Sequence, residues 1–286
     1  MSDRLEVRKT YKLYVGGAFP RSESGRVFEV SDANGDFVAN MAKASRKDAR
    51  DAVLAARKGF SAWSSATAYN RGQVLYRIAE VMEGRSTQFA DELQLLGGIS
   101  AKKARQEVEQ AIDRTVWYAG WADKLTQVVG TANPVAGPHF NFSIPEPTGV
   151  VVAVAPSTPA LLGLVNVLAP IIVSGNAAII VASEAQPVVA ITLAEVLDSS
   201  DVPAGAVNIL TGSVAEIMPW LASHGDVNAL DLSGVADAEL AVQLEQEAAG
   251  TLKRVHRVPV RAERTPSLQQ MIAFLEIKTV WHPMGR

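Results

Sequence analysis

Short, almost uniformly apolar runs alternate with longer amphipathic segments in the middle of this chain. Residues 148–155 and 177–182 are two such runs, and the segment between them carries apolar residues at spacings of three and four. That spacing is typical of one face of a helix, and continuous apolar runs are typical of strands buried on both faces of a parallel sheet. The pattern predicts a strand, a helix and a second strand.

The same alternation continues toward the carboxyl end. It predicts helices from Pro187, Ser213 and Asp237, with strands at 206–210 and 228–232 between them. A repeated strand–helix order predicts an α/β fold with a doubly wound parallel sheet. Because such sheets bind ligands at the carboxyl ends of their strands, we expect candidate binding residues in the loops that follow the strands.

The first part of the chain predicts a helical layer over one side of this sheet. Residues 11–19 and 26–30 alternate well enough to predict a short hairpin. Ser45 then begins a helix with a capping box, two further helices follow, and Ser100 caps a long helix that reaches about Leu125.

Two other segments alternate apolar and polar residues and predict strands with two unlike faces. In 134–147, Phe140 and Phe142 alternate with polar side chains. In 271–282, Ile277 and Trp281 fall on the same face. An ordinary edge strand is the simpler interpretation of each.

Composition excludes several classes of function. The 286 residues are 48% hydrophobic, which is ample for a core, and the net charge of −3 disfavours nucleic acid and anionic membranes as partners. The start of the chain shows no apolar signal region, and the longest apolar stretch, 160–173, is too short to span a bilayer. We therefore expect a cytoplasmic protein.

The chain contains no cysteine, which excludes disulfides, thiolate metal sites and a cysteine nucleophile. The histidines at 139, 224, 256 and 282 show no metal-ligand spacing, so no metal site is predicted.

Six short motifs, in this order, resemble segments of the aldehyde dehydrogenase superfamily. They are EPTGVV from Glu146, APSTP, SGN, SE-x-x-P, VPAGAVNILTG and LASHGDVNALDLSG. The resemblance extends to YVGGAF near the start, YAGWADKL from Tyr118 and EIKTVW near the end.

The resemblance implies a Rossmann-like, NAD(P)-binding-type domain made of residues 1–133 and 148–260. Segments 134–147 and 270–286 resemble the strands of a small oligomerisation sheet. The family's catalytic domain is expected to be absent, because residues 261–269 lead directly to the last strand.

Family chemistry uses a cysteine nucleophile, an asparagine that stabilises the oxyanion and a general-base glutamate. By resemblance, Thr158 stands at the asparagine position and Val258 at the glutamate position. A hydroxyl can donate one hydrogen bond, but nothing replaces the nucleophile or the base. We therefore expect no catalytic residue in this chain.

Cofactor binding is a separate question. The positions that correspond to the family's cofactor site are Pro156, Thr158, Ser183, Glu184, Gly212, Ser233 and Gly234. Valine replaces polar residues at Val181 and Val235, so we favour a purely structural role for the glycines and expect NAD(P) binding to be weak or absent.

Three hypotheses follow. The first is a catalytically inactive (pseudoenzyme) subunit that forms a homodimer or pairs with a full-length aldehyde dehydrogenase. The second is an NAD(P)-binding oxidoreductase subunit whose active site is completed by a partner chain. The third is a nucleotide-independent scaffold of a multienzyme complex.

Overall fold

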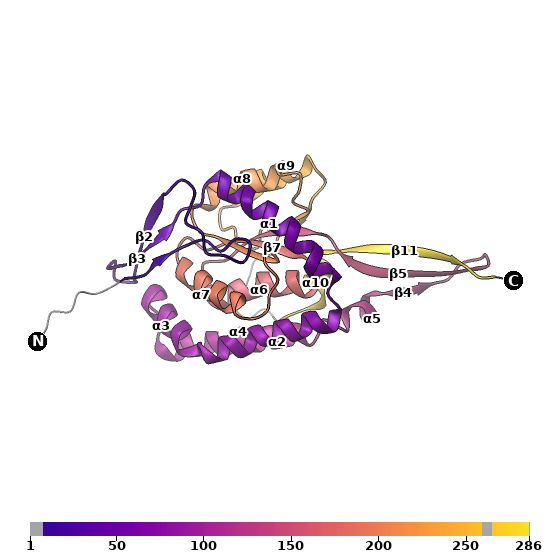
Figure 1. The fold of residues 1–286 in the computed structure, drawn as a ribbon, viewed down its shortest axis with the longest axis horizontal. Helices are drawn as coiled ribbons and strands as arrows, with labels where there is room; N and C mark the ends of the chain where they lie inside the picture. The colour runs from indigo at the N-terminus through magenta and orange to yellow at the C-terminus, as the bar shows by residue number, and fades with distance from the viewer. Residues whose placement is uncertain (1–7, 259–264, 286) are drawn as a thin grey trace, which may run out of the picture.

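The computed structural model describes residues 8–258 and 265–285, which form a body and a projecting arm (Figure 1). Part of the polar segment expected at 261–269, and the predicted domain end at residue 260, lie outside the described residues. The helices are α1 (Arg46–Ser65), α2 (Ala68–Gly84), α3 (Ser86–Gly97), α4 (Ala101–Ala119), α5 (Leu125–Val129), α6 (Ala160–Val173), α7 (Pro187–Asp198), α8 (Val214–Ser223), α9 (Ala238–Ala249) and α10 (Leu268–Ile272).

A five-stranded parallel sheet forms the centre of the body, in the order β10-β9-β6-β7-β8. Its strands are β6 (Val150–Val154), β7 (Ala177–Val181), β8 (Val207–Leu210), β9 (Ala229–Asp231) and β10 (Arg254–His256). Strands β6 to β9 are buried at every position, as their apolar runs predict. The strand order reverses between β6 and β9, which confirms a doubly wound sheet.

Alternate residues of β6 face two separate parts of the core. Val151 and Ala153 belong to a cluster with α2, α3, α4, α6 and α7, whereas Val150 and Val152 belong to a second cluster with α1 and α8. Figure 1 shows α1, α8 and α9 on one side of the sheet and the other large helices on the opposite side.

Helix α1 does not belong to the single helical layer that we expected from the sequence. Helices α2, α3 and α4 form an outer layer over α6 and α7, but α1 lies directly on β7 and β8 at the other face. Small residues allow this approach, because a Cβ atom on Gly59 would lie 2.2 Å from the carbonyl carbon of Gly205. The contact joins residues far apart in sequence, so local pattern could not reveal it.

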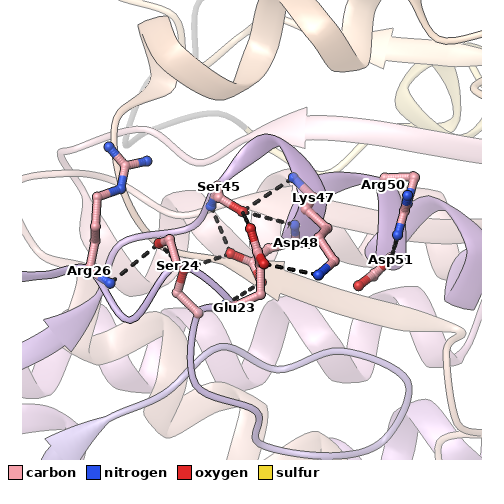
Figure 2. Close-up of polar contacts among 9 residues, drawn as sticks. Glu23, Ser24, Arg26, Ser45, Lys47, Asp48, Arg50 and Asp51 are labelled. Atoms are coloured by element: carbon pink, nitrogen blue, oxygen red, sulfur yellow. Dashed lines mark hydrogen bonds and ion pairs between the residues drawn. The ribbon is translucent and has the colours of Figure 1, made fainter.

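Helix α1 begins where its capping box predicts. Ser45 Oγ accepts a hydrogen bond from the Asp48 N–H at 3.2 Å, and Asp48 Oδ2 accepts one from the Ser45 N–H at 2.7 Å. The buried Asp48 carboxylate also accepts from Ser22 Oγ at 2.7 Å and from the Glu23 N–H at 3.0 Å. This network fixes the loop before β2 to the start of α1 (Figure 2).

The expected hairpin of 11–19 with 26–30 is wrong in its pairing. Three strands form this small sheet, β1 (Thr10–Tyr11), β2 (Val27–Ser31) and β3 (Phe37–Ala42), and both β1 and β2 pair with β3. Asp32 Oδ1 accepts from the N–H groups of Asn34 and Asp36, which forms the turn between β2 and β3. Tyr14 instead bridges to Ile209 at the edge of the large sheet.

The arm is a three-stranded antiparallel sheet of β4 (Thr131–Asn133), β5 (His139–Pro147) and β11 (Leu275–Pro283), in the order β11-β5-β4. Strand β5 leads into β6, so the arm leaves the body at the amino end of the large sheet (Figure 1). The long helix expected to reach Leu125 ends at Ala119, and α5 follows at the root of the arm.

The root of β11 belongs to the body. Met271, Phe274 and Leu275 are buried, and the Phe274 carbonyl accepts hydrogen bonds from the Thr148 N–H at 3.2 Å and from Asn176 Nδ2 at 2.8 Å. Within the ranges 8–258 and 265–285, no helix combines the length and the apolar character needed to cross a membrane.

Candidate functional site at the carboxyl edge of the sheet

All the candidate cofactor residues lie at the carboxyl edge of the large sheet. Pro156 and Thr158 follow β6, Ser183 and Glu184 follow β7, Gly212 follows β8, and Ser233 and Gly234 follow β9. The strand order reverses between β6 and β9, so these loops surround the place where doubly wound sheets bind ligands. Their local contacts show what each residue does.

Gly234 brings the loop after β9 against the end of β6. A Cβ atom at this position would lie 2.1 Å from the Val154 carbonyl oxygen and 2.8 Å from the Pro156 nitrogen. Pro156 is itself buried against Gly163 of α6, where a Cβ atom would lie 2.4 Å from the proline ring. Gly234 therefore permits close packing against backbone, and Gly163 permits close packing against the ring of Pro156.

Glu184 caps a helix of its own chain. Its Oε1 accepts a hydrogen bond from the Val214 N–H, at the first residue of α8, at 2.7 Å. Ser183 Oγ accepts from the Ala185 N–H at 3.2 Å, which shapes the turn after β7. The Glu184 carboxylate that could hold a ribose hydroxyl is thus already hydrogen-bonded, although its side chain is exposed.

Gly212 lies against the segment that connects β3 to α1. Its φ of +132° is one that glycine adopts readily, and a Cβ atom there would lie 3.1 Å from the Ala44 nitrogen. The carbonyl of the neighbouring Thr211 accepts a hydrogen bond from the Ala44 N–H at 2.8 Å, and Thr211 Oγ1 donates one to the Ala42 carbonyl at 2.6 Å. Gly212 therefore lets the segment between β3 and α1 cross the end of β8.

The two positions that resemble catalytic residues of the family hold a threonine and a valine. Thr158 is exposed in the loop after β6, and Val258 is 41% exposed beyond β10. Ser233 Oγ accepts a hydrogen bond from the Val258 N–H at 3.4 Å, and the Ser233 N–H donates to Asp231 Oδ1 at 2.9 Å. Thr158 offers a hydroxyl and Val258 an aliphatic side chain, so neither supplies the amide or the carboxylate that the resemblance places there.

A carboxylate that the sequence did not reveal occupies the amino end of α6. Glu107 of α4 accepts hydrogen bonds through Oε1 from the N–H groups of Leu161 at 2.8 Å and Leu162 at 3.3 Å. Burial raises the pKa of the Glu107 carboxyl. In a doubly wound sheet, the helix after the first strand commonly receives the phosphates of a nucleotide. Here, a side chain of the protein takes that position.

A carboxylate also accepts hydrogen bonds from the N–H groups at the amino end of α9. Asp237 Oδ1 accepts from the N–H groups of Glu239 at 2.9 Å and Leu240 at 3.2 Å. The amino ends of α6, α8 and α9 therefore all carry carboxylates of this chain, from Glu107, Glu184 and Asp237 respectively. The N–H donors at these three helix ends are therefore already hydrogen-bonded within the chain.

The described residues contain no group of three histidine, aspartate or glutamate side chains that could hold a metal ion. Four cavities are lined by residues other than the candidates, and the largest of these four, about 370 Å³, lies between α3 and α4.

This arrangement defines a doubly wound α/β protein with side-chain carboxylates of its own at the amino ends of three helices on the carboxyl edge of the sheet. Residues 19–257 match the model of the aldehyde dehydrogenase family. The chain belongs to that family, which confirms the resemblance seen in its motifs.

Two relatives show how much of a family member's length this chain covers. It is 31% identical over 261 residues to the putative aldehyde dehydrogenase DhaS of Bacillus subtilis, covering 89% of this chain and 52% of that protein. It is 34% identical over 258 residues to retinal dehydrogenase 2 of Mus musculus, covering 88% and 48% respectively. The chain spans about half the length of the curated relatives it matches.

Solved structures give the same picture of the fold. Betaine aldehyde dehydrogenase from Staphylococcus aureus, in complex with NAD+, superposes with a TM-score of 0.81 at 23% identity, over 85% of this chain and 49% of that one. An NAD-dependent aldehyde dehydrogenase from Sinorhizobium meliloti gives a TM-score of 0.80 at 26% identity, over 87% and 50%.

Proposed function

We propose that this chain is a catalytically inactive member of the aldehyde dehydrogenase family that acts through assembly, either as a homodimer or as a partner of a full-length aldehyde dehydrogenase. The observation that carries the proposal is chemical. A chain without cysteine has no thiolate to attack an aldehyde, and the positions that resemble the oxyanion donor and the base hold Thr158 and Val258.

In this proposal the body and the arm have different roles. The body is the cofactor-type domain and the arm is the oligomerisation element, with Met271, Phe274 and Leu275 packed in the body at the root of β11. The carboxylates at the amino ends of α6, α8 and α9 support weak or absent NAD(P) binding. The cytoplasmic location expected from the sequence stays a prediction.

An activity assay tests the proposal. The purified chain should give no aldehyde-dependent reduction of NAD or NADP with short, long or aromatic aldehydes, and calorimetry should find NAD(P) affinity weaker than about 1 mM. Turnover in the usual range of about 1–1000 per second would refute it. Co-purification of the tagged chain from its own cells distinguishes self-assembly from pairing with a full-length relative.

A second candidate is a cofactor-binding subunit whose active site is completed by another chain. The exposed Glu184 favours it, because this carboxylate could exchange the Val214 N–H for a ribose hydroxyl. A micromolar dissociation constant for NAD(P) that Glu184→Ala weakens would favour this function over the first.

A further inference from the structure

Strand β11 forms one long open edge of the arm. It pairs with β5 along all nine of its residues, from Leu275 opposite Pro147 to Pro283 opposite His139. No further described strand lies on its other side, because the sheet order is β11-β5-β4. Ile277 is 53% exposed and Trp281 is 60% exposed on the same face of this strand.

The backbone groups on that open edge can be identified. The Thr148 N–H donates to the Phe274 carbonyl at 3.2 Å, and the Met284 N–H donates to the Pro138 carbonyl at 2.9 Å. Antiparallel strands direct alternate residues toward the same neighbour, so even-numbered residues of β11 face β5. The N–H and C=O groups of Ile277, Thr279 and Trp281 therefore face outward.

The opposite edge of the arm is shorter and is interrupted by prolines. Strand β4 has only three residues, which lie opposite 141–143 of β5. From β4 toward the body, the outward-facing positions of β5 are Pro145 and Pro147, which have no N–H to donate. Among the described strands of the arm, β11 therefore offers the longer edge to a partner strand.

We propose that two copies of this chain pair antiparallel through β11, around a two-fold axis at Thr279, to form one continuous six-stranded sheet from their three-stranded arms. The inference rests on the proposed assembly function and specifies its interface. The second copy is the occupant because the edge of β11 is complementary to itself in one register.

That register pairs the whole strand, since Leu275 then lies opposite Pro283 of the second copy. Thr279 faces its own equivalent on the axis. Ile277 lies opposite Trp281 of the second copy, so the exposed apolar side chains contact each other across the new strand pair. Glu276 lies opposite His282 of the second copy, so a carboxylate acceptor faces a potential donor.

Neighbouring registers lose these features. If the two-fold axis lies one residue nearer the body, Lys278 is directly opposite Lys278 of the second copy. Like charges in that position are destabilising. A shift the other way leaves Leu275 and Glu276 without a partner in the second copy, and it separates Ile277 from Trp281 of that copy. A larger shift toward the root would require residues of α10, which are packed in the body.

The absence of cysteine makes disulfide trapping a clean test. In Thr279→Cys, the two cysteines would lie across a hydrogen-bonded pair with Cα atoms about 5.5 Å apart, within disulfide range. We expect mild oxidation to convert most of this variant into a covalent dimer. Ile277→Cys alone is the control, because its copies would be about 14 Å apart along the strand. A mixture of Ile277→Cys and Trp281→Cys should cross-link.

A backbone variant supplies the second measurement. Thr279→Pro removes an outward N–H and no backbone hydrogen bond to β5, so light scattering should show the wild-type dimer shifting to the mass of one chain. Proline and valine at this position both lose the hydroxyl that hydrogen-bonds Ser143 Oγ at 2.9 Å, so the two variants differ in the N–H. Thr279→Val keeps the N–H and should remain a dimer. A wild-type dimer that survives Thr279→Pro, or a Thr279→Cys variant that does not cross-link, overturns this pairing and leaves the assembly function standing.

A wild-type chain that is monomeric at micromolar concentration also overturns the pairing, and then only assembly with a foreign chain remains. Aldehyde-dependent turnover by the purified chain would instead overturn the proposed function without bearing on β11. The two failures are therefore distinguishable.

Discussion

Glu107 joins two helices through hydrogen bonds to backbone. Its Oε1 accepts from the Leu161 N–H at 2.8 Å, and alanine at this position would leave that donor without its partner. We expect Glu107→Ala to lower the free energy of unfolding by about 1–2 kcal/mol, measured by urea denaturation. Glu109→Ala, at an exposed position of the same helix, should change it by less than about 0.5 kcal/mol. Equal losses in the two variants would contradict the capping role.

Glu92 of α3 predicts a dependence of stability on pH. Burial raises the pKa of its carboxyl, although Thr192 Oγ1 and Gln88 Nε2 donate hydrogen bonds to it at 2.8 and 2.9 Å. The folded state therefore binds this proton more readily than the unfolded state, so the contribution of Glu92 to stability is fully present below the unfolded pKa and decreases as the pH rises through the folded pKa.

Glu92→Gln removes this titration and keeps an acceptor for both donors. We expect the urea midpoint of the variant to exceed that of the wild type at pH 7.5, and the advantage to shrink or reverse at pH 4. A difference between the two proteins that is the same at both pH values would show that burial of Glu92 has no effect on its ionisation.

At the scale of elements, the loops after β6 and β9 are held together at Gly234. A Cβ atom there would lie 2.1 Å from the Val154 carbonyl oxygen, so the two loops must separate to admit a side chain. We expect Gly234→Ala to lower the free energy of unfolding by at least about 2 kcal/mol. Gly225→Ala is the matched control, because no atom lies within 4 Å of the added Cβ. Similar unfolding midpoints for the two variants would contradict close packing at this site.

Elements that depend on neighbouring residues could be predicted from the sequence. The apolar runs of β6 and β7 and the caps at Ser45, Ser100 and Asp237 are all local features. Contacts between distant residues could not be predicted in this way. The approach of Gly59 to Gly205 and the hydrogen bond from the Leu161 N–H to Glu107, 54 residues away, exist only once the chain has folded.

The candidate site shows the same limit. Sequence placed Glu184 and Gly234 at the correct edge of the sheet, because both follow predicted strands. The sequence could not show that Glu184 caps α8, because the Val214 N–H is 30 residues away along the chain. The contacts that decide whether a cofactor has room are tertiary, and a pattern of single positions does not contain them.

At the scale of the whole molecule, β11 belongs to both body and arm, and two truncations separate these roles. A chain ending at Gln270 loses Met271, Phe274 and Leu275, all of which are buried. Loss of buried side chains of this size costs several kcal/mol, about 2–5 for each leucine- or phenylalanine-sized group. We expect this chain to unfold at much lower urea concentration than the wild type or to aggregate.

A chain ending at Leu275 keeps those buried residues and removes only the projecting part of β11. It also loses the ion pair between Arg254 and Glu276, whose atoms lie 2.7 Å apart at an exposed position and contribute little to stability. The body should therefore unfold near the wild-type urea midpoint. The edge of β5 that β11 covered becomes open, so the chain should be monomeric or associate irregularly, and light scattering should no longer show a defined dimer. A defined dimer in this truncated chain would place the interface on the body, because the arm would no longer carry the strand on which the assembly depends.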